Sequence, residues 1–177
     1  MYKSLNNVFL VGPMGAGKTT IGRLLADELG KQFHDSDQFI EERAGADISW
    51  IFDVEGEPGF RVRERAAIED LCALDNIVLA TGGGAVLAEE NRQHLRKRGF
   101  VVYLKATIAQ QVERTKRDQK RPLLKNADDP KAKLTALMEL RDPLYRDVAD
   151  ITVMTSRRSP RAVCNEILQQ IRQAAGV

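Results

Sequence analysis

The strongest chemical signal in this chain is a glycine-rich octapeptide close to its N-terminus. Residues 12–19 read Gly-Pro-Met-Gly-Ala-Gly-Lys-Thr and fit the phosphate-binding pattern G-x-x-x-x-G-K-[ST]. Glycines let backbone N–H groups turn toward phosphate oxygens, Lys18 can reach the β- and γ-phosphates, and Thr19 offers a hydroxyl ligand to Mg²⁺. The loop predicts nucleotide binding by Gly12, Gly15, Ala16, Gly17, Lys18, Thr19 and Thr20.

A second candidate group is the acidic pair in Asp35-Ser36-Asp37, which follows a short apolar segment. Asp35 could hold Mg²⁺ through water, and Asp37 could contact or polarise an acceptor hydroxyl. The alternative is a helix N-cap, which Ser36 or Asp37 would supply. Capping and catalysis are compatible, so the position favours a functional role.

Three consecutive glycines, Gly82, Gly83 and Gly84, follow the apolar segment 77–80 and Thr81. One glycine suffices for a turn, so a run of three favours close approach of a ligand to open backbone N–H groups. Many phosphate-loop proteins place a metal-binding aspartate at the end of this strand, and this chain has none there. Metal binding is then left to Thr19, the nucleotide and Asp35.

Several arginines could recognise anions. Arg61 could grip a carboxylate bidentately, with Glu64 orienting it as an i, i+3 partner, and this interpretation competes evenly with a solvated helix face. Arg141 precedes Pro143 and could instead be a surface ion pair. The basic stretch from Arg114 to Arg121 has no interleaved aromatic residues, so a phosphate-facing lid is favoured over nucleic acid, with Arg121 beside the transferred phosphoryl group.

The elements that must position these groups alternate between strand and helix. Such alternation predicts a parallel sheet covered by helices on both faces, with ligands at the carboxyl ends of the strands. Residues 45–59 are rich in glycine and acids and predict an irregular lobe anchored by Trp50 and Phe52. The predicted strands are 8–11, 32–34, 77–80, 100–104 and 151–153; the predicted helices are 18–29, 37–44, 60–74, 89–97, 108–117, 131–140 and 160–174.

Length and composition fit one globular domain. The chain has 177 residues, 43% of them hydrophobic, and a formal net charge of +2, which gives no signal for a nucleic-acid or membrane partner. No apolar run is long enough to cross a bilayer or to form a signal peptide. Cys72 and Cys164 are expected to be core residues in a reducing compartment. We expect a cytoplasmic monomer.

Taken together, these motifs strongly resemble shikimate kinase, over about residues 7–172. The resemblance implies an α/β P-loop NTPase of the nucleoside-monophosphate-kinase type. It implies one domain over residues 1–177, a five-stranded parallel sheet of order 2-3-1-4-5, a substrate lobe at about 34–64 and a lid at about 115–129. The motifs that carry it are the phosphate loop, Phe33–Asp37, Gly59-Phe60-Arg61 with Glu64, Thr81–Gly84, Arg121–Leu124 and Arg141 with Pro143-Leu144-Tyr145.

The resemblance also implies an activity: transfer of the γ-phosphoryl group of ATP to the 3-hydroxyl of shikimate, with Mg²⁺, in aromatic amino-acid biosynthesis. Its implied catalytic residues are Lys18, Asp37 and Arg121. For shikimate it implies Asp37 on the ring hydroxyls, Arg61 and Arg141 on the carboxylate, and Gly82, Gly83 and Gly84 lining the ring. For the nucleotide it implies Asp35 and Thr19 at Mg²⁺, Arg121 at the phosphates, and Arg114 with Arg158 around the adenine.

Three alternatives remain to be weighed against this hypothesis. Another small-molecule P-loop kinase, such as gluconate kinase, should lack the Arg61 and Arg141 contexts. A GTP switch should carry N-K-x-D, whereas the segment after residues 100–104 reads Lys105-Ala106-Thr107. An inactive relative should have lost Lys18, Asp37 or Arg121, and all three are present.

Overall fold

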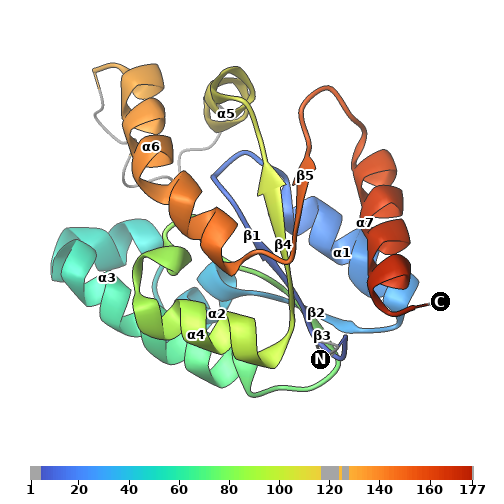
Figure 1. Ribbon diagram of the computed structural model, residues 1–177. Coiled ribbons are helices and arrows are strands. Elements are labelled where there is room, and N and C mark those ends of the chain that lie inside the picture. The colour runs from blue at the N-terminus through green and yellow to red at the C-terminus, as the bar shows by residue number, and fades with distance from the viewer. Residues whose placement is uncertain (1–4, 117–123, 125–127, 177) are drawn as a thin grey trace.

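The fold is built on a twisted sheet of five parallel strands (Figure 1). The computed structural model describes residues 5–116, 124 and 128–176. The strands pair in the order β2-β3-β1-β4-β5, which confirms the predicted α/β class and strand order. They are β1 (Val8–Val11), β2 (Gln32–Asp35), β3 (Ile77–Ala80), β4 (Phe100–Lys105) and β5 (Ile151–Met154).

Helices cover both faces of this sheet because strand side chains alternate between the faces. Val8 and Leu10 pack toward α1 and α7, whereas Phe9 and Val11 pack toward α3, α4 and α6. Figure 1 shows α1 and α7 together on one side of the sheet. The helices are α1 (Lys18–Leu29), α2 (Ser36–Ala44), α3 (Ile48–Cys72), the 3₁₀ turn η1 (Ala85–Leu87), α4 (Glu89–Arg98), α5 (Ile108–Thr115), α6 (Pro130–Val148) and α7 (Pro160–Ala174).

The segment expected to be irregular, residues 45–59, is largely helical. Asp47 caps the N-terminus of α3 by accepting the N–H of Trp50 at 2.8 Å, and only Gly56 (φ 72°, ψ 176°) leaves helical geometry. Pro58 lies in the first turn after that break, where a missing N–H costs no helical bond. The prediction failed because glycine and proline indicate breaks but do not exclude helix between them.

The same lobe is anchored differently from the prediction. Trp50 is 52% exposed, so it does not hold the lobe. Phe52 stacks on Phe60 with ring centroids 4.8 Å apart, beside the buried side chains of Ile40 and Ile51. This small third core joins α2 to α3 and keeps the first half of α3 attached to the sheet domain.

Helix α6 is longer than predicted. It was expected to end near residue 140, but it continues through Pro143 to Val148. Burial of Tyr145 and Val148 against the sheet offsets the hydrogen bond that Pro143 cannot donate. As a result, Arg141 and Tyr145 lie one turn apart on a single rigid helix.

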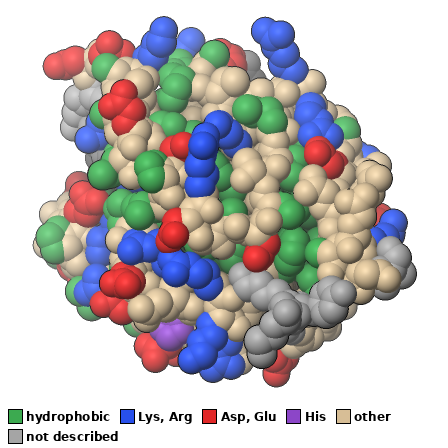
Figure 2. All heavy atoms as spheres, viewed as in Figure 1, with side chains coloured by type: hydrophobic (Ala, Val, Ile, Leu, Met, Phe, Trp, Pro, Cys, Tyr) green, Lys and Arg blue, Asp and Glu red, His purple; other side chains and the backbone are tan. Residues whose placement is uncertain are grey.

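Charged side chains of both signs share the face of the molecule that Figure 2 shows. On the face drawn in Figure 2, basic and acidic side chains are interspersed, in keeping with a net charge of only +2. Both cysteines are buried and free, which agrees with their prediction as core residues. Among the described residues, no helix combines the length and apolar character needed to span a bilayer.

Candidate active site

The predicted site residues of the first three strands converge on one open cleft of about 380 Å³. It lies where β1, β2 and β3 end, as expected for a parallel α/β sheet. The cleft therefore brings the phosphate loop together with Asp37, Gly82 and Gly83. Its lining includes Gly15, Gly17, Lys18, Thr19, Thr20, Asp35, Asp37, Thr81, Gly82, Gly83 and Arg114.

The phosphate loop depends on glycine at both ends. Gly12 has φ 146°, and a Cβ there would lie 2.3 Å from the carbonyl oxygen of Leu104 on β4. Gly17 has φ 89° and forms the N-cap of α1. The Lys18 ammonium donates to the carbonyls of Gly12 at 2.6 Å and Pro13 at 2.8 Å. The lysine is thus held across the mouth of the loop, at the positive end of a helix.

Asp35 serves two elements at once. Its Oδ1 accepts the N–H groups of Asp37 at 2.9 Å and Gln38 at 3.2 Å, so Asp35 caps α2, rather than Ser36 or Asp37. Its Oδ2 accepts the Thr19 hydroxyl at 2.9 Å. One carboxylate therefore caps α2 and also contacts the hydroxyl of the phosphate-loop residue Thr19. Two oxygen ligands side by side at the phosphate loop fit Mg²⁺, which takes one or two protein oxygens and completes its shell with phosphates and water.

Ser36, which sequence reasoning treated only as a cap, ties α2 to the glycine segment. Its buried Oγ accepts the N–H of Gly82 at 2.9 Å. The prediction that this N–H is open to a ligand was therefore wrong. Within the described part of the chain, the N–H groups of Gly83 and Gly84 have no acceptor. A Cβ on Gly82 would lie 2.7 Å from Asp37 Oδ1, so the segment approaches Asp37 closely.

Two guanidinium groups meet at the Gly83–Gly84 peptide. Arg61 arrives from α3, and a Cβ on Gly84 would lie 2.5 Å from each of its terminal nitrogens. Arg141 arrives from α6, is 4% exposed, and has Nη1 3.4 Å from the corresponding position on Gly83. Both arginines therefore lie beside the glycine run.

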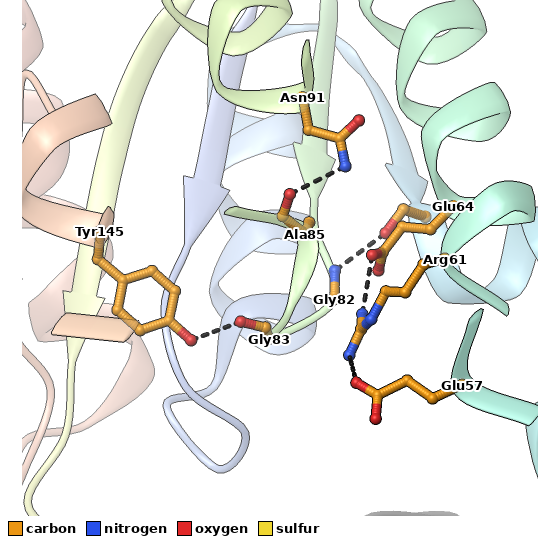
Figure 3. A network of polar contacts seen from close by, with 9 residues as sticks. Glu57, Arg61, Glu64, Gly82, Gly83, Ala85, Asn91 and Tyr145 are labelled. Atoms are coloured by element: carbon orange, nitrogen blue, oxygen red, sulfur yellow. Dashed lines mark hydrogen bonds and ion pairs between the residues drawn. The ribbon is translucent and has the colours of Figure 1, made fainter. Parts of the chain in front are cut away.

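Glutamates hold the first of these arginines. Arg61 Nη1 donates to Glu64 Oε1 at 2.8 Å, the predicted i, i+3 pair, and Nη2 donates to Glu57 Oε1 at 3.2 Å (Figure 3). Glu64 is 1% exposed; burial raises its pKa, and the charges of Arg61 and Arg141 oppose that rise. The group carries two cations close together and is suited to a small carboxylate anion.

The predicted adenine contacts line a smaller hollow beside the phosphate loop, of about 190 Å³. Arg114 and Arg158 both line it, and Arg114 Nη1 donates to the carbonyl of Gly15 at 3.2 Å. Arg158 donates to the carbonyl of Met154 at 3.1 Å and pairs with Glu166. Arg121 and most of the predicted lid lie outside the described residues.

Sequence reasoning missed two polar residues behind the glycine segment. The Tyr145 hydroxyl donates to the carbonyl of Gly83 at 2.5 Å, and the Asn91 amide donates to that of Ala85 at 2.9 Å (Figure 3). Both side chains are 1% exposed. The available signal for Tyr145 was its place in the motif with Arg141, to which no role was attached; nothing in the sequence singled out Asn91.

Comparisons with known proteins agree with this geometry. The shikimate kinase family model matches residues 14–172. The chain is 60% identical to the shikimate kinase of Pseudomonas putida over 96% of this chain and 98% of that one. It belongs to the shikimate kinase family. It is accordingly an ATP-dependent kinase that phosphorylates shikimate in the biosynthesis of aromatic amino acids.

Further members of the shikimate kinase family support this placement. The Actinobacillus succinogenes enzyme is 58% identical over 93% of this chain and 94% of its own length. The Acinetobacter baumannii shikimate kinase, solved in complex with shikimate, superposes with a TM-score of 0.93 at 49% identity, covering 97% of this chain and 96% of that one. The family membership removes the GTP-switch and gluconate-kinase alternatives.

Proposed function

We propose that this shikimate kinase holds the shikimate carboxylate between Arg61 and Arg141, and the ring hydroxyls at Asp37 and the Gly82–Gly84 segment. The observation that carries the proposal is the meeting of two guanidinium groups at the Gly83–Gly84 peptide, close to Asp37. The Acinetobacter baumannii relative was solved with shikimate bound, which supports an acceptor site on this fold. Gly82 would contribute close backbone approach rather than an open N–H.

The nucleotide would lie along the phosphate loop, with its adenine between Arg114 and Arg158. Lys18, already aimed across the loop, would exchange its carbonyl acceptors for the β- and γ-phosphates. Asp37 would orient the 3-hydroxyl and accept its proton. Phosphoryl transfer needs mainly alignment and charge neutralisation, and these groups supply both.

We further propose Mg²⁺ as the divalent metal. Thr19 and Asp35 would hold it, since their oxygens lie together beside the phosphate loop. When bound, Mg²⁺ neutralises charge on the nucleotide phosphates. Arg121 keeps its sequence-based assignment to the transferred phosphoryl group.

We also propose one domain with an acceptor lobe at about 34–64, acting as a cytoplasmic monomer without nucleic-acid or membrane partners. Two free buried cysteines and a net charge of +2 support this proposal. Light scattering at micromolar concentration tests the oligomeric state, and a stable dimer would contradict it.

Steady-state kinetics on arginine variants tests the acceptor assignment. Arg61→Ala and Arg141→Ala should each raise the KM for shikimate about 100-fold, with the KM for ATP within about threefold of wild type. Arg63→Ala is the matched control, because Arg63 lies on the same helix but pairs with Glu55. A control variant as impaired as Arg61→Ala, or equal losses for both substrates, would contradict the assignment.

A further inference from the structure

Three consecutive glycines give the Gly82–Gly84 segment few conformational restraints of its own. Glycine populates positive and negative φ about equally, so a peptide between two glycines can turn over at low cost. The ends of the segment are held. Ser36 accepts the N–H of Gly82 at 2.9 Å, and Ala85 donates its N–H to the carbonyl of Gly82 at 3.1 Å. The Gly83–Gly84 peptide between these anchors needs a separate restraint.

Tyr145 supplies a restraint at that peptide. Its side chain points from α6 to the glycine segment, and its hydroxyl donates to the Gly83 carbonyl at 2.5 Å (Figure 3). The carbonyl of Gly83 and the N–H of Gly84 belong to one planar peptide and point in opposite directions. Holding the carbonyl toward Tyr145 therefore directs the Gly84 N–H to the other side, and that N–H has no acceptor within the described residues.

We propose that Tyr145 is a positioning residue for the acceptor: its hydroxyl fixes the Gly83–Gly84 peptide between the guanidinium groups of Arg61 and Arg141. The inference rests on the acceptor site proposed above. The hydroxyl of Tyr145 is placed to link the two arginines. Tyr145 lies one turn after Arg141 on α6, and the peptide that it holds ends at Gly84, which lies against Arg61. Burial raises the pKa of Tyr145 to about 12, so the hydroxyl keeps its proton and donates throughout the neutral range.

The chain offers a closely matched control in Tyr103. Its ring lies 4.9 Å from that of Tyr145, and the two side chains are 0% and 1% exposed, respectively. The Tyr103 hydroxyl also bonds to α6, donating to Asp142 Oδ1 at 2.7 Å, and within the described residues no hydrogen bond joins it to the glycine segment. Removing either hydroxyl deletes a partly buried hydrogen bond in the same core, and of the two hydroxyls only that of Tyr145 donates to the Gly83 carbonyl. Tyr145 also lies against the charge of Arg141.

Kinetics and unfolding of Tyr145→Phe and Tyr103→Phe test the inference. Tyr145→Phe should raise the KM for shikimate about fivefold, with kcat and the KM for ATP within about twofold of wild type. Tyr103→Phe should leave all three within about twofold, although both variants lower the urea midpoint. Shikimate should raise the Tm of Tyr145→Phe less than that of Tyr103→Phe at equal concentration.

Three results would overturn the inference. The first is a folded Tyr145→Phe enzyme with the wild-type KM for shikimate. The second is an equal rise in the KM for shikimate in Tyr103→Phe, which would show that any loosening of α6 is enough to weaken shikimate binding. The third is a Tyr145→Phe chain that does not fold beside a Tyr103→Phe chain that does, because the hydroxyl would then serve folding. Arg61→Ala, measured in parallel, separates the two proposals. If this variant leaves the KM for shikimate unchanged, the proposed acceptor site is wrong, whatever Tyr145→Phe shows.

Discussion

Gly84→Ala gives a direct test of how the acceptor clamp is packed. A Cβ at this position would lie 2.5 Å from Nη1 and Nη2 of Arg61, about 0.9 Å short of ordinary contact at 3.4 Å. The backbone itself can accept alanine, since Gly84 has φ −97°. The new methyl group must therefore be accommodated by displacement of the Arg61 guanidinium, which is the far end of a flexible side chain.

The size of this displacement sets the expected effect. Charge-assisted hydrogen bonds keep donor–acceptor distances within about 2.7–2.9 Å, so a shift of nearly 1 Å removes a bidentate grip on a carboxylate. The pair formed by Arg61 and Glu64, 2.8 Å apart, would also be disturbed. Hydrogen bonds to charged groups are worth about 1.5–3 kcal/mol, which predicts a rise of roughly 10- to 100-fold in the KM for shikimate.

Gly83→Ala is the matched control for this prediction. Its Cβ would lie 3.4 Å from Arg141 Nη1 and 3.6 Å from the nitrogen of Met14, which is ordinary contact. Because Gly83 belongs to the proposed acceptor site, we expect its KM for shikimate to rise, but by less than that of Gly84→Ala, since the Arg61 guanidinium is not displaced. Initial rates with each substrate varied, and thermal melts of both variants, provide the measurement. A wild-type KM in Gly84→Ala, a parallel rise in the KM for ATP, or an equal defect in Gly83→Ala would refute the packing argument.

Three further predictions address the reaction and the core. Lys18→Ala should lower kcat at least about 100-fold in ADP-release assays, and unchanged turnover would contradict the phosphate-loop mechanism. Asp37→Asn should lower kcat about 100-fold or more, since the amide cannot accept the hydroxyl proton. A variant in which only the KM for shikimate rises, with kcat unchanged, would show that Asp37 binds the acceptor without acting as a base. Burial raises the pKa of Cys72 from 9.0 to about 12. The unfolded chain thus loses this proton first, so stability should fall as pH rises from about 9 to about 12, and urea unfolding of Cys72→Ala should show a shallower decline.

The sequence was sufficient to predict the strand order, the loop that leads into α1 and the pairing of Arg61 with Glu64, because short motifs determine each locally or through the family resemblance. It failed where tertiary packing decides. Pro143 indicated the end of a helix, yet burial of Tyr145 and Val148 carries α6 past it. Likewise, a run of glycines indicated open N–H groups, but the partner of Gly82 comes from Ser36, 46 residues away along the chain. Contacts between distant segments leave no local pattern.

The polar groups assigned to ligands are mostly paired within the protein before a ligand arrives. Lys18 bonds carbonyls of its own loop, Thr19 bonds Asp35, and Arg61 bonds Glu64. Each pair holds its side chain near its proposed working position, which lowers the ordering cost of binding. Each also competes with the ligand, because a new contact replaces an existing one. This competition is weaker for arginine, because its five N–H donors let Arg61 remain bonded to Glu64 while it binds a carboxylate. Lys18, in contrast, has to exchange its carbonyl acceptors for phosphate oxygens. Substitution of Arg61 by lysine should therefore cost more acceptor affinity than its unchanged charge suggests.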